Sequence, residues 1–221
     1  MTDWSNMLDT PWFAIDHMAV FSDIREFLDF AESNIEPQKT AALQRIEDDE
    51  PEFEDEADAQ SYRQHQLQSA DFRFEVALPM RIRYAGLMSF IGTVEWSMKV
   101  IKPAFKVPKK PSGISETIHL VRQFAARCGM SITCEIDQLE FLTWVRNVIT
   151  HNAGLLKGAA REAEIRAQIV TYGPAFKLSD WHFIGETVEI QRGALDPIID
   201  RWSEIIRELH TVATKKKLIK F

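Results

Sequence analysis

The sequence has only two cysteines, Cys128 and Cys134, and no long uncharged hydrophobic run. The cysteines show neither the spacing of a zinc site nor a disulfide framework, which favours a reducing, cytoplasmic environment. The first residues lack the basic and then apolar plan of a signal peptide. The most apolar stretch, residues 84–101, contains Glu95 and Lys99. We therefore expect a buried helix there and no membrane span.

Several common catalytic motifs are also missing. There is no G-x-G-x-x-G, no Walker loop, no G-x-S-x-G and no H-E-x-x-H, and the six histidines are scattered along the chain. Most of the acids outside one run are dispersed over helical segments, so paired carboxylates for glycosidase chemistry find no support. We expect neither a metal site nor a cofactor.

The negative charge is concentrated in one place. The net charge is −7, but residues 47–58 contain nine acids and no base, so the rest of the chain carries about +2. Overall acidity therefore does not exclude an RNA partner. The preferred interpretation of the acidic run is a solvated insertion. The alternative is an RNA mimic that shields a basic site until a partner moves it.

The length and the patterning predict one all-α domain that spans residues 1–221. The hydrophobic fraction of 45% and the charged fraction of 27% are typical of a globular protein. Residues 1–75 form an N-terminal helical extension that contains the acidic insertion. Residues 176–190 alternate apolar and polar side chains, which indicates either a small hairpin turning near Gly185 or an extended excursion.

Apolar residues recur at helical spacing in most of the chain. Gly86 and Gly92 are expected to let another helix approach residues 78–101 closely. Residues 102–112 hold three prolines, so we expect a loop there. The expected helices are 12–35, 36–45, 58–75, 78–101, 116–128, 137–154, 158–170 and 194–212.

The segment 137–154 is the most informative of these helices. Asp137 is a good N-cap, and Glu140 stands in the position of its capping-box partner. Gly154 is placed to end the helix, since glycine enters the left-handed conformation without a side-chain penalty. The arc toward the core contains Phe141, Leu142, Trp144, Val145, Val148 and Ile149.

The opposite arc is polar but poor in charge. An ordinary solvated face would carry several lysines and glutamates, whereas this one suits a buried interface or a functional site. It has one guanidinium, one imidazole, one amide and two hydroxyls, contributed by Thr143, Arg146, Asn147, Thr150 and His151. Asn147 and His151 lie four residues apart and are neighbours on the helix surface.

This arc resembles the R-x4-H signature of HEPN domains. The segment is RNVITH, residues 146–151, and Asn152 and Gly154 follow it. In that family a polar residue, often asparagine, follows the arginine. The resemblance covers residues 75–210 as a helical pattern, and about ten residues carry it specifically. It implies a HEPN-like helical bundle that usually dimerises; many such domains are metal-independent endoribonucleases of toxin, phage-defence or RNA-processing systems.

The resemblance implies catalytic roles for Arg146 and His151. His151 is the general base or acid, because an imidazole takes or gives a proton near neutral pH. Arg146 clamps the scissile phosphate and stabilises the phosphorane charge. Asn147 orients His151 or binds a phosphate oxygen, and Asn152 is a further supporting residue. The expected product is a 2′,3′-cyclic phosphate at a site shared by two copies.

Glu95 and a lysine-rich loop complete the candidate set. A carboxylate among apolar residues needs a partner, so Glu95 either bonds a backbone amide or a lysine, or pairs with Arg146 or His151. The loop interleaves cations with Phe105, which is the pattern of a single-stranded RNA contact and also of an ordinary solvated loop. Its lysines are Lys102, Lys106, Lys109 and Lys110.

Two further interpretations stay open. In the first, the chain is a non-catalytic interaction module, in which Arg146 pairs with Glu95 and His151 interacts favourably with the C-terminal end of the helix dipole. In the second, it is a toxin with an antitoxin or defence-system partner protein. Toxins of this family that are neutralised by a nucleotidyltransferase typically carry a tyrosine two residues after the histidine. Here that position is Ala153, which argues against tyrosine modification as the control.

Overall fold

The chain is mostly helical, as its periodicity predicts. The computed structural model describes residues 12–48, 53, 55–102, 105–181 and 185–215. In the described part, no helix is long and apolar enough to cross a membrane. The elements in chain order are α1 (Trp12–Ser33), α2 (Ile35–Asp48), α3 (Glu56–Asp71), the π-helical turn η2 (Phe72–Ala77), α4 (Leu78–Ile101), α5 (Glu116–Cys128), α6 (Thr133–Asn152), α7 (Glu162–Tyr172), β1 (Phe176–Trp181), β2 (Gly185–Ile190) and α8 (Asp196–Lys215).

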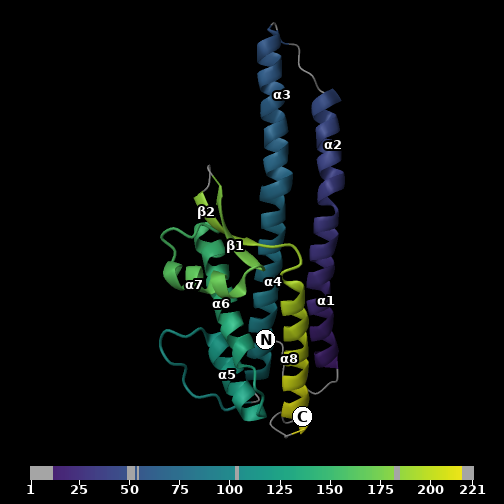
Figure 1. Cartoon of the computed structure of the whole chain (residues 1–221). Helices are drawn as coiled ribbons and strands as arrows, with labels where there is room; N and C mark the ends of the chain where they lie inside the picture. Colours follow the sequence, from purple (N-terminus) through teal and green to yellow (C-terminus); the bar gives the residue numbers. More distant parts are fainter. Residues whose placement is uncertain (1–11, 49–52, 54, 103–104, 182–184, 216–221) are drawn as a thin grey trace, which may run out of the picture.

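Two long helical rods run side by side through the molecule (Figure 1). One consists of α1 and α2 and the other of α3, η2 and α4, and their α2 and α3 ends project beyond the body as an arm. None of the described side chains of α2 is buried, and in α3 only Ala70 is. At the base of the arm, Lys39 bonds Glu75 at 2.7 Å and Asp71 at 3.1 Å. These bonds raise the pKa of Lys39 to about 12.

The described residues of the acidic run lie at the ends of α2 and α3 that are farthest from the body. Residues 49–52 and 54 lie outside the described part of the chain, but Glu47, Asp55 and Glu56 are described and exposed. The Asp55 carboxylate caps α3 by accepting a bond from the Ala57 amide at 2.9 Å. The acidic run therefore begins in the last turn of α2 and ends in the first turn of α3 (Figure 1).

The body surrounds helix α4. Its neighbours in the packing are α1, α5, α6, α8 and β2. The apolar side of α8 is buried as expected, with Trp202 and Ile199 fully enclosed. Arg25 on α1 bonds Asp200 on α8 at 2.6 Å and joins these two helices at the surface. The largest enclosed side chains are Phe21, Phe90, Phe124, Phe141 and Phe176, together with Trp202.

The two glycines of α4 have different surroundings. A Cβ added at Gly86 would lie 2.6 Å from Leu28 Cδ2, so α1 approaches α4 here as predicted. At Gly92 the same prediction is wrong, because no described atom lies within 4 Å of the added Cβ. Gly92 points to open space on the outer side of α4.

The predicted start of the motif helix is also wrong. Helix α6 begins at Thr133 after Ile132, whose side chain makes no capping hydrogen bond, and Asp137 lies inside the first turns. Glu140 is not a capping-box partner, since its carboxylate accepts a bond from Arg122 at 3.0 Å. Packing of Ile132, which is 3% exposed, fixes the earlier start.

The hairpin is confirmed. Strands β1 and β2 pair antiparallel, with Trp181 opposite Gly185 and Phe176 opposite Ile190. Leu155 forms an isolated bridge to Thr187, so β2 also pairs with the chain leaving α6. By contrast, the helix expected at 158–170 begins only at Glu162, after Arg161 in the left-handed region (φ 64°).

The two glycines provide a matched test of this packing. Gly86→Ala should destabilise the protein by about 1–3 kcal/mol, because the new methyl group overlaps Leu28 in a close-packed contact. Gly92→Ala should instead stabilise it by about 0.5–1 kcal/mol, since alanine favours a helix interior and space is open there. Urea unfolding of both variants measures the difference. If both substitutions changed the free energy of unfolding by the same amount in the same direction, the close contact between α1 and α4 would be contradicted.

Candidate functional site

The outer face of α6 carries the residues singled out by the sequence. Asn147, Thr150 and His151 are exposed, and Arg146 is half-buried at the edge beside α4. Thr143 is an exception, because it is only 7% exposed and its hydroxyl donates to the Leu139 carbonyl at 2.8 Å. The face is therefore smaller than predicted and lies in the C-terminal half of the helix.

Arg146 has a defined partner. Its Nη2 donates to Glu95 Oε1 at 2.9 Å, and the two side chains are 25% and 27% exposed. This pair explains how α4 accommodates a carboxylate among apolar residues. The Arg146 Nε is buried and has no hydrogen-bond partner among the described residues. Glu95 thus holds the guanidinium at the surface through one of its ends.

The Arg146–Glu95 pair lies within a surface formed by two helices. The Thr150 hydroxyl contacts Met88 Sδ at 3.6 Å, so α4 and α6 run antiparallel here. Met88 and Trp96, which are 37% and 44% exposed, stand on the outer side of α4 with open space at Gly92 between them. We call this surface of Met88, Gly92, Trp96, Arg146 and Thr150 the α4–α6 face.

His151 stands apart from Arg146. It is exposed, and no hydrogen bond to it is present in the described part of the chain. Five residues along an α-helix correspond to about 7.5 Å of rise and to side-chain directions about 140° apart. Arg146 is directed toward α4 and its partner Glu95, whereas His151 projects from the far side of Asn147. The two side chains do not converge on one atom.

The residues after His151 have a structural explanation. Ala153 and Gly154 adopt positive φ values of 52° and 90°, and the Asn152 amide donates to the Leu155 carbonyl at 3.4 Å. A Cβ on Gly154 would lie 2.5 Å from the Tyr84 hydroxyl. Hence glycine is required at 154 by close packing as well as by the end of the helix.

Tyr84 connects this turn to the hairpin. Its hydroxyl donates to the Val188 carbonyl at 2.6 Å, and burial, with the charge of Glu189 adding to it, raises the pKa of Tyr84 above its ordinary value. The Asn152–Gly154 segment is therefore held by contacts that would be needed whether or not His151 is catalytic.

The lysine-rich loop is placed away from His151. Because α4 and α6 are antiparallel, the C-terminal end of α4 lies beside the N-terminal half of α6. Lys102 bonds Glu116 at 2.6 Å and Lys110 donates to the Ile114 carbonyl at 2.6 Å, while Lys106 and Lys109 are exposed. The loop is therefore remote from the imidazole in the same copy.

Phe105 is not available for stacking on RNA. It is 6% exposed, and its ring lies 4.4 Å from that of Phe124 between centroids. The His119 Nε2 lies 2.9 Å from the Pro108 carbonyl oxygen and holds the loop farther along. Periodicity could not show this, because an aromatic among lysines looks the same whether it anchors a loop or projects from it.

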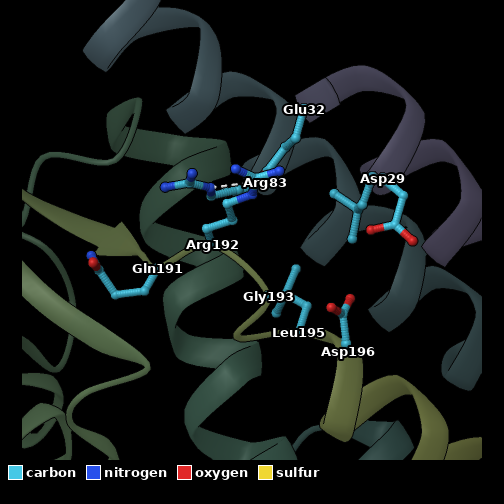
Figure 2. A pocket seen from close by; sticks show the side chains of 9 residues that line it. Asp29, Glu32, Arg83, Gln191, Arg192, Gly193, Leu195 and Asp196 are labelled. Carbon is cyan, nitrogen blue, oxygen red and sulfur yellow. Dashed lines mark hydrogen bonds and ion pairs between the residues drawn. The ribbon is translucent and has the colours of Figure 1, made fainter. Parts of the chain in front are cut away.

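A polar pocket that the sequence did not indicate lies between α1, α4 and the connection from β2 to α8. Figure 2 shows Glu32 beside Arg83 and Arg192, and Asp29 and Asp196 on the pocket wall. Glu32 Oε1 bonds Arg83 at 2.7 Å and its Oε2 bonds Arg192 at 3.0 Å, although the Glu32 side chain is only 8% exposed. The pocket encloses about 90 Å³, and its ion pairs connect three segments of the fold.

Asp196 has an unfavourable position in this pocket. Burial raises its pKa above the ordinary value, and the carboxylates of Asp29, Asp200 and Glu32 add to the rise while Arg25 opposes it. The ionised form of Asp196 is therefore less stable in the folded chain than in the unfolded one.

Comparison with known proteins does not identify the chain. No protein-family model, no curated protein and no solved structure matches it. Among the described residues, no group of three or more His, Cys, Asp and Glu side chains is arranged to hold a metal ion. Functional inference therefore rests on the geometry of the α6 face and its surroundings.

Asp196 predicts a pH dependence of stability. Since its pKa is higher in the folded state, the free energy of unfolding should fall as pH rises above about 4 through ionisation of this group. Asp196→Asn has no carboxylate to ionise at this position. In urea unfolding, the free energy of unfolding of this variant should therefore increase relative to that of wild type as pH rises over the same range. Asp23→Asn, an exposed change on α1, is the control. If the free energy of unfolding of wild type and of Asp196→Asn changed in parallel with pH, the raised pKa of Asp196 would be contradicted.

Proposed function

We propose that the protein is a metal-independent endoribonuclease of the HEPN type that acts as a homodimer. The observation that carries the proposal is the arrangement on α6, where an exposed and unbonded His151 lies five residues from an Arg146 that Glu95 holds at the surface. Asn147 and Thr150, which lie between them on α6, are uncharged, so Glu95 is the carboxylate with which a phosphate must compete for the guanidinium.

The chemistry is a transesterification within RNA. One His151 takes the proton from a 2′-hydroxyl, and the 2′-oxygen forms a bond to the adjacent phosphorus. The bond from phosphorus to the 5′-oxygen then breaks, and a protonated imidazole gives that oxygen its proton. The products are a 2′,3′-cyclic phosphate and a 5′-hydroxyl. Arg146 stabilises the charge on the phosphorane, and Asn147 orients the imidazole or binds a phosphate oxygen.

A second copy completes the site. Within one chain Arg146 and His151 project in different directions, so a single phosphate between them needs groups from both copies. The α4–α6 face offers a surface for this, because Met88 and Trp96 are exposed beside Arg146 and Gly92 leaves room for a close approach. The basic loop with Lys106 and Lys109 would contact more distant phosphates.

The family proposal places the protein in a cytoplasmic toxin, phage-defence or RNA-processing system. An antitoxin or defence partner protein would then control it. The resemblance of the RNVITH segment supports this, together with the helical architecture around it.

The cleavage prediction concerns His151 and Arg146. His151→Ala and Arg146→Ala should each lower the rate of RNA cleavage by about 100-fold or more. Arg146→Lys should fail as well, since an ammonium lacks the two-pronged donor geometry of the guanidinium. Cleavage of single-stranded and structured RNA is measured in EDTA, in which wild type is expected to stay active.

Matched controls keep this assay specific. His65→Ala changes an exposed histidine on the arm, and Arg207→Ala changes an exposed arginine on α8; both should cleave like wild type. Losing the ion pair with Glu95 should lower the free energy of unfolding of Arg146→Ala by only about 1 kcal/mol, so this variant should stay folded. Cleavage that persists in His151→Ala, or that requires added Mg²⁺, would refute the mechanism.

A second candidate function is a non-catalytic interaction module. The observation that favours it is the Arg146–Glu95 bond itself, because an arginine that pairs a carboxylate also serves a purely structural role. In that case the α4–α6 face binds a second copy, and His151 interacts favourably with the C-terminal end of the α6 dipole.

The dimer prediction separates assembly from catalysis. Wild type should sediment as a dimer at micromolar concentration, and Met88→Glu should give a monomer because it places a charge in the apolar contact. Val170→Glu, at an apolar position on α7 that is 84% exposed, should remain dimeric. A dimer whose His151→Ala variant equals wild type in every RNA assay supports the module. A wild-type monomer would refute the shared site.

A further inference from the structure

A pocket of about 350 Å³ lies between α5 and the first turns of α6. Its floor is apolar and buried, formed by Ala125, Ile132 and Ile136, which are 3–6% exposed. Its rim is polar, with Arg122 from α5 and Asp137 from α6. A flat, largely apolar group with hydrogen-bonding edges fits such a site better than a fully charged or a fully aliphatic one.

The two rim residues, Arg122 and Asp137, differ in their hydrogen bonding. Arg122 is held by Glu140 at 3.0 Å and is 39% exposed, so its guanidinium plane is positioned and still accessible. Asp137 is exposed and has no hydrogen-bond partner in the described part of the chain. Its carboxylate can therefore accept two N–H bonds, while the guanidinium plane can stack on a ring.

Further basic residues lie on α5 and on the loop bonded to it, outside the pocket lining. Arg127, which follows the rim residue Ala126, donates to the Lys106 carbonyl and so holds the lysine-rich loop beside α5. Lys106 and Arg127 are both exposed and add positive charge to the surface formed by α5 and this loop. A ligand that joins a ring to phosphate groups has complementary charge.

The pocket and His151 share one helix and one side of it. At 100° per residue, Ile136, Glu140, Asn147 and His151 all fall within about 60° of arc on α6. The rise from Asp137 to His151 is about 21 Å. An RNA strand that runs along α6 would thus reach both the pocket and the imidazole, several nucleotides apart.

We propose that this pocket binds a guanine base of the RNA and selects the cleavage position. The inference that the ligand is part of an RNA substrate rests on the proposed function. Guanine presents a ring N–H and an exocyclic amino group side by side, and these two donors match the two oxygens of the Asp137 carboxylate. The ring faces the Arg122 guanidinium, and its inner edge covers the apolar floor.

Binding tests the pocket without any cleavage. Wild type should bind guanosine 5′-monophosphate at least about tenfold more tightly than uridine 5′-monophosphate in ligand-observed NMR titrations. Asp137→Asn should abolish that preference, because an amide replaces one acceptor with a donor. Ala126→Trp should block the pocket from α5, and Asp23→Asn should have no effect. Equal binding of both nucleotides to wild type would overturn the proposal.

Cleavage mapping separates this proposal from the ribonuclease proposal. Wild type should cut at a constant distance from guanine, and both pocket variants should lose that preference while keeping their dependence on His151. Suppose that cleavage depends on His151 but that Asp137→Asn still cuts at a constant distance from guanine. That result would overturn the proposed guanine pocket and leave the ribonuclease proposal standing. Binding of guanosine monophosphate that needs Asp137, in a protein that cleaves no RNA, would support the pocket and overturn the ribonuclease.

Discussion

The burial of helix α4 is the constraint on which the rest of the structure depends. Apolar burial is not directional, so it brings α1, α6 and α8 against α4 without fixing how they align. Polar groups with single acceptable partners fix the alignment. Glu95 needs Arg146 on α6, and the Tyr84 hydroxyl needs the Val188 carbonyl on β2.

These contacts give the α6 face a rigid base. One helix carries Asp137, Asn147 and His151, so the spacing of these three residues follows from helical geometry and not from the packing of loops. The arm, in contrast, contributes little to this base, because Ala70 is the one buried side chain among the described residues of α2 and α3. The described acids of the acidic run, Glu47, Asp55 and Glu56 among them, are exposed, so water and salt screen their mutual repulsion and keep them hydrated.

Local signals were enough to predict most helices, whereas the alternation in residues 176–190 left a hairpin as one of two possibilities. The ends of α4 and α5 are as predicted. In α5 the ends are set locally, because the Ser115 hydroxyl accepts a hydrogen bond from the Ile118 amide and Gly129 ends the helix at a φ of 74°. Such caps involve residues within a few positions of one another, which a sequence shows directly. The candidate residues Arg146 and His151 were visible for the same reason, since their arc is set by helical periodicity.

By itself, the sequence determined the helical class and the polar arc of α6, because these depend on the order of neighbouring residues. Only the tertiary structure decided that α6 starts at Thr133, that Phe105 is an anchor in the core and that Gly92 faces open space. The tertiary structure also brought together the residues that line each of the two pockets. Each of these depends on residues far apart in the chain, and their contacts follow from how whole helices pack.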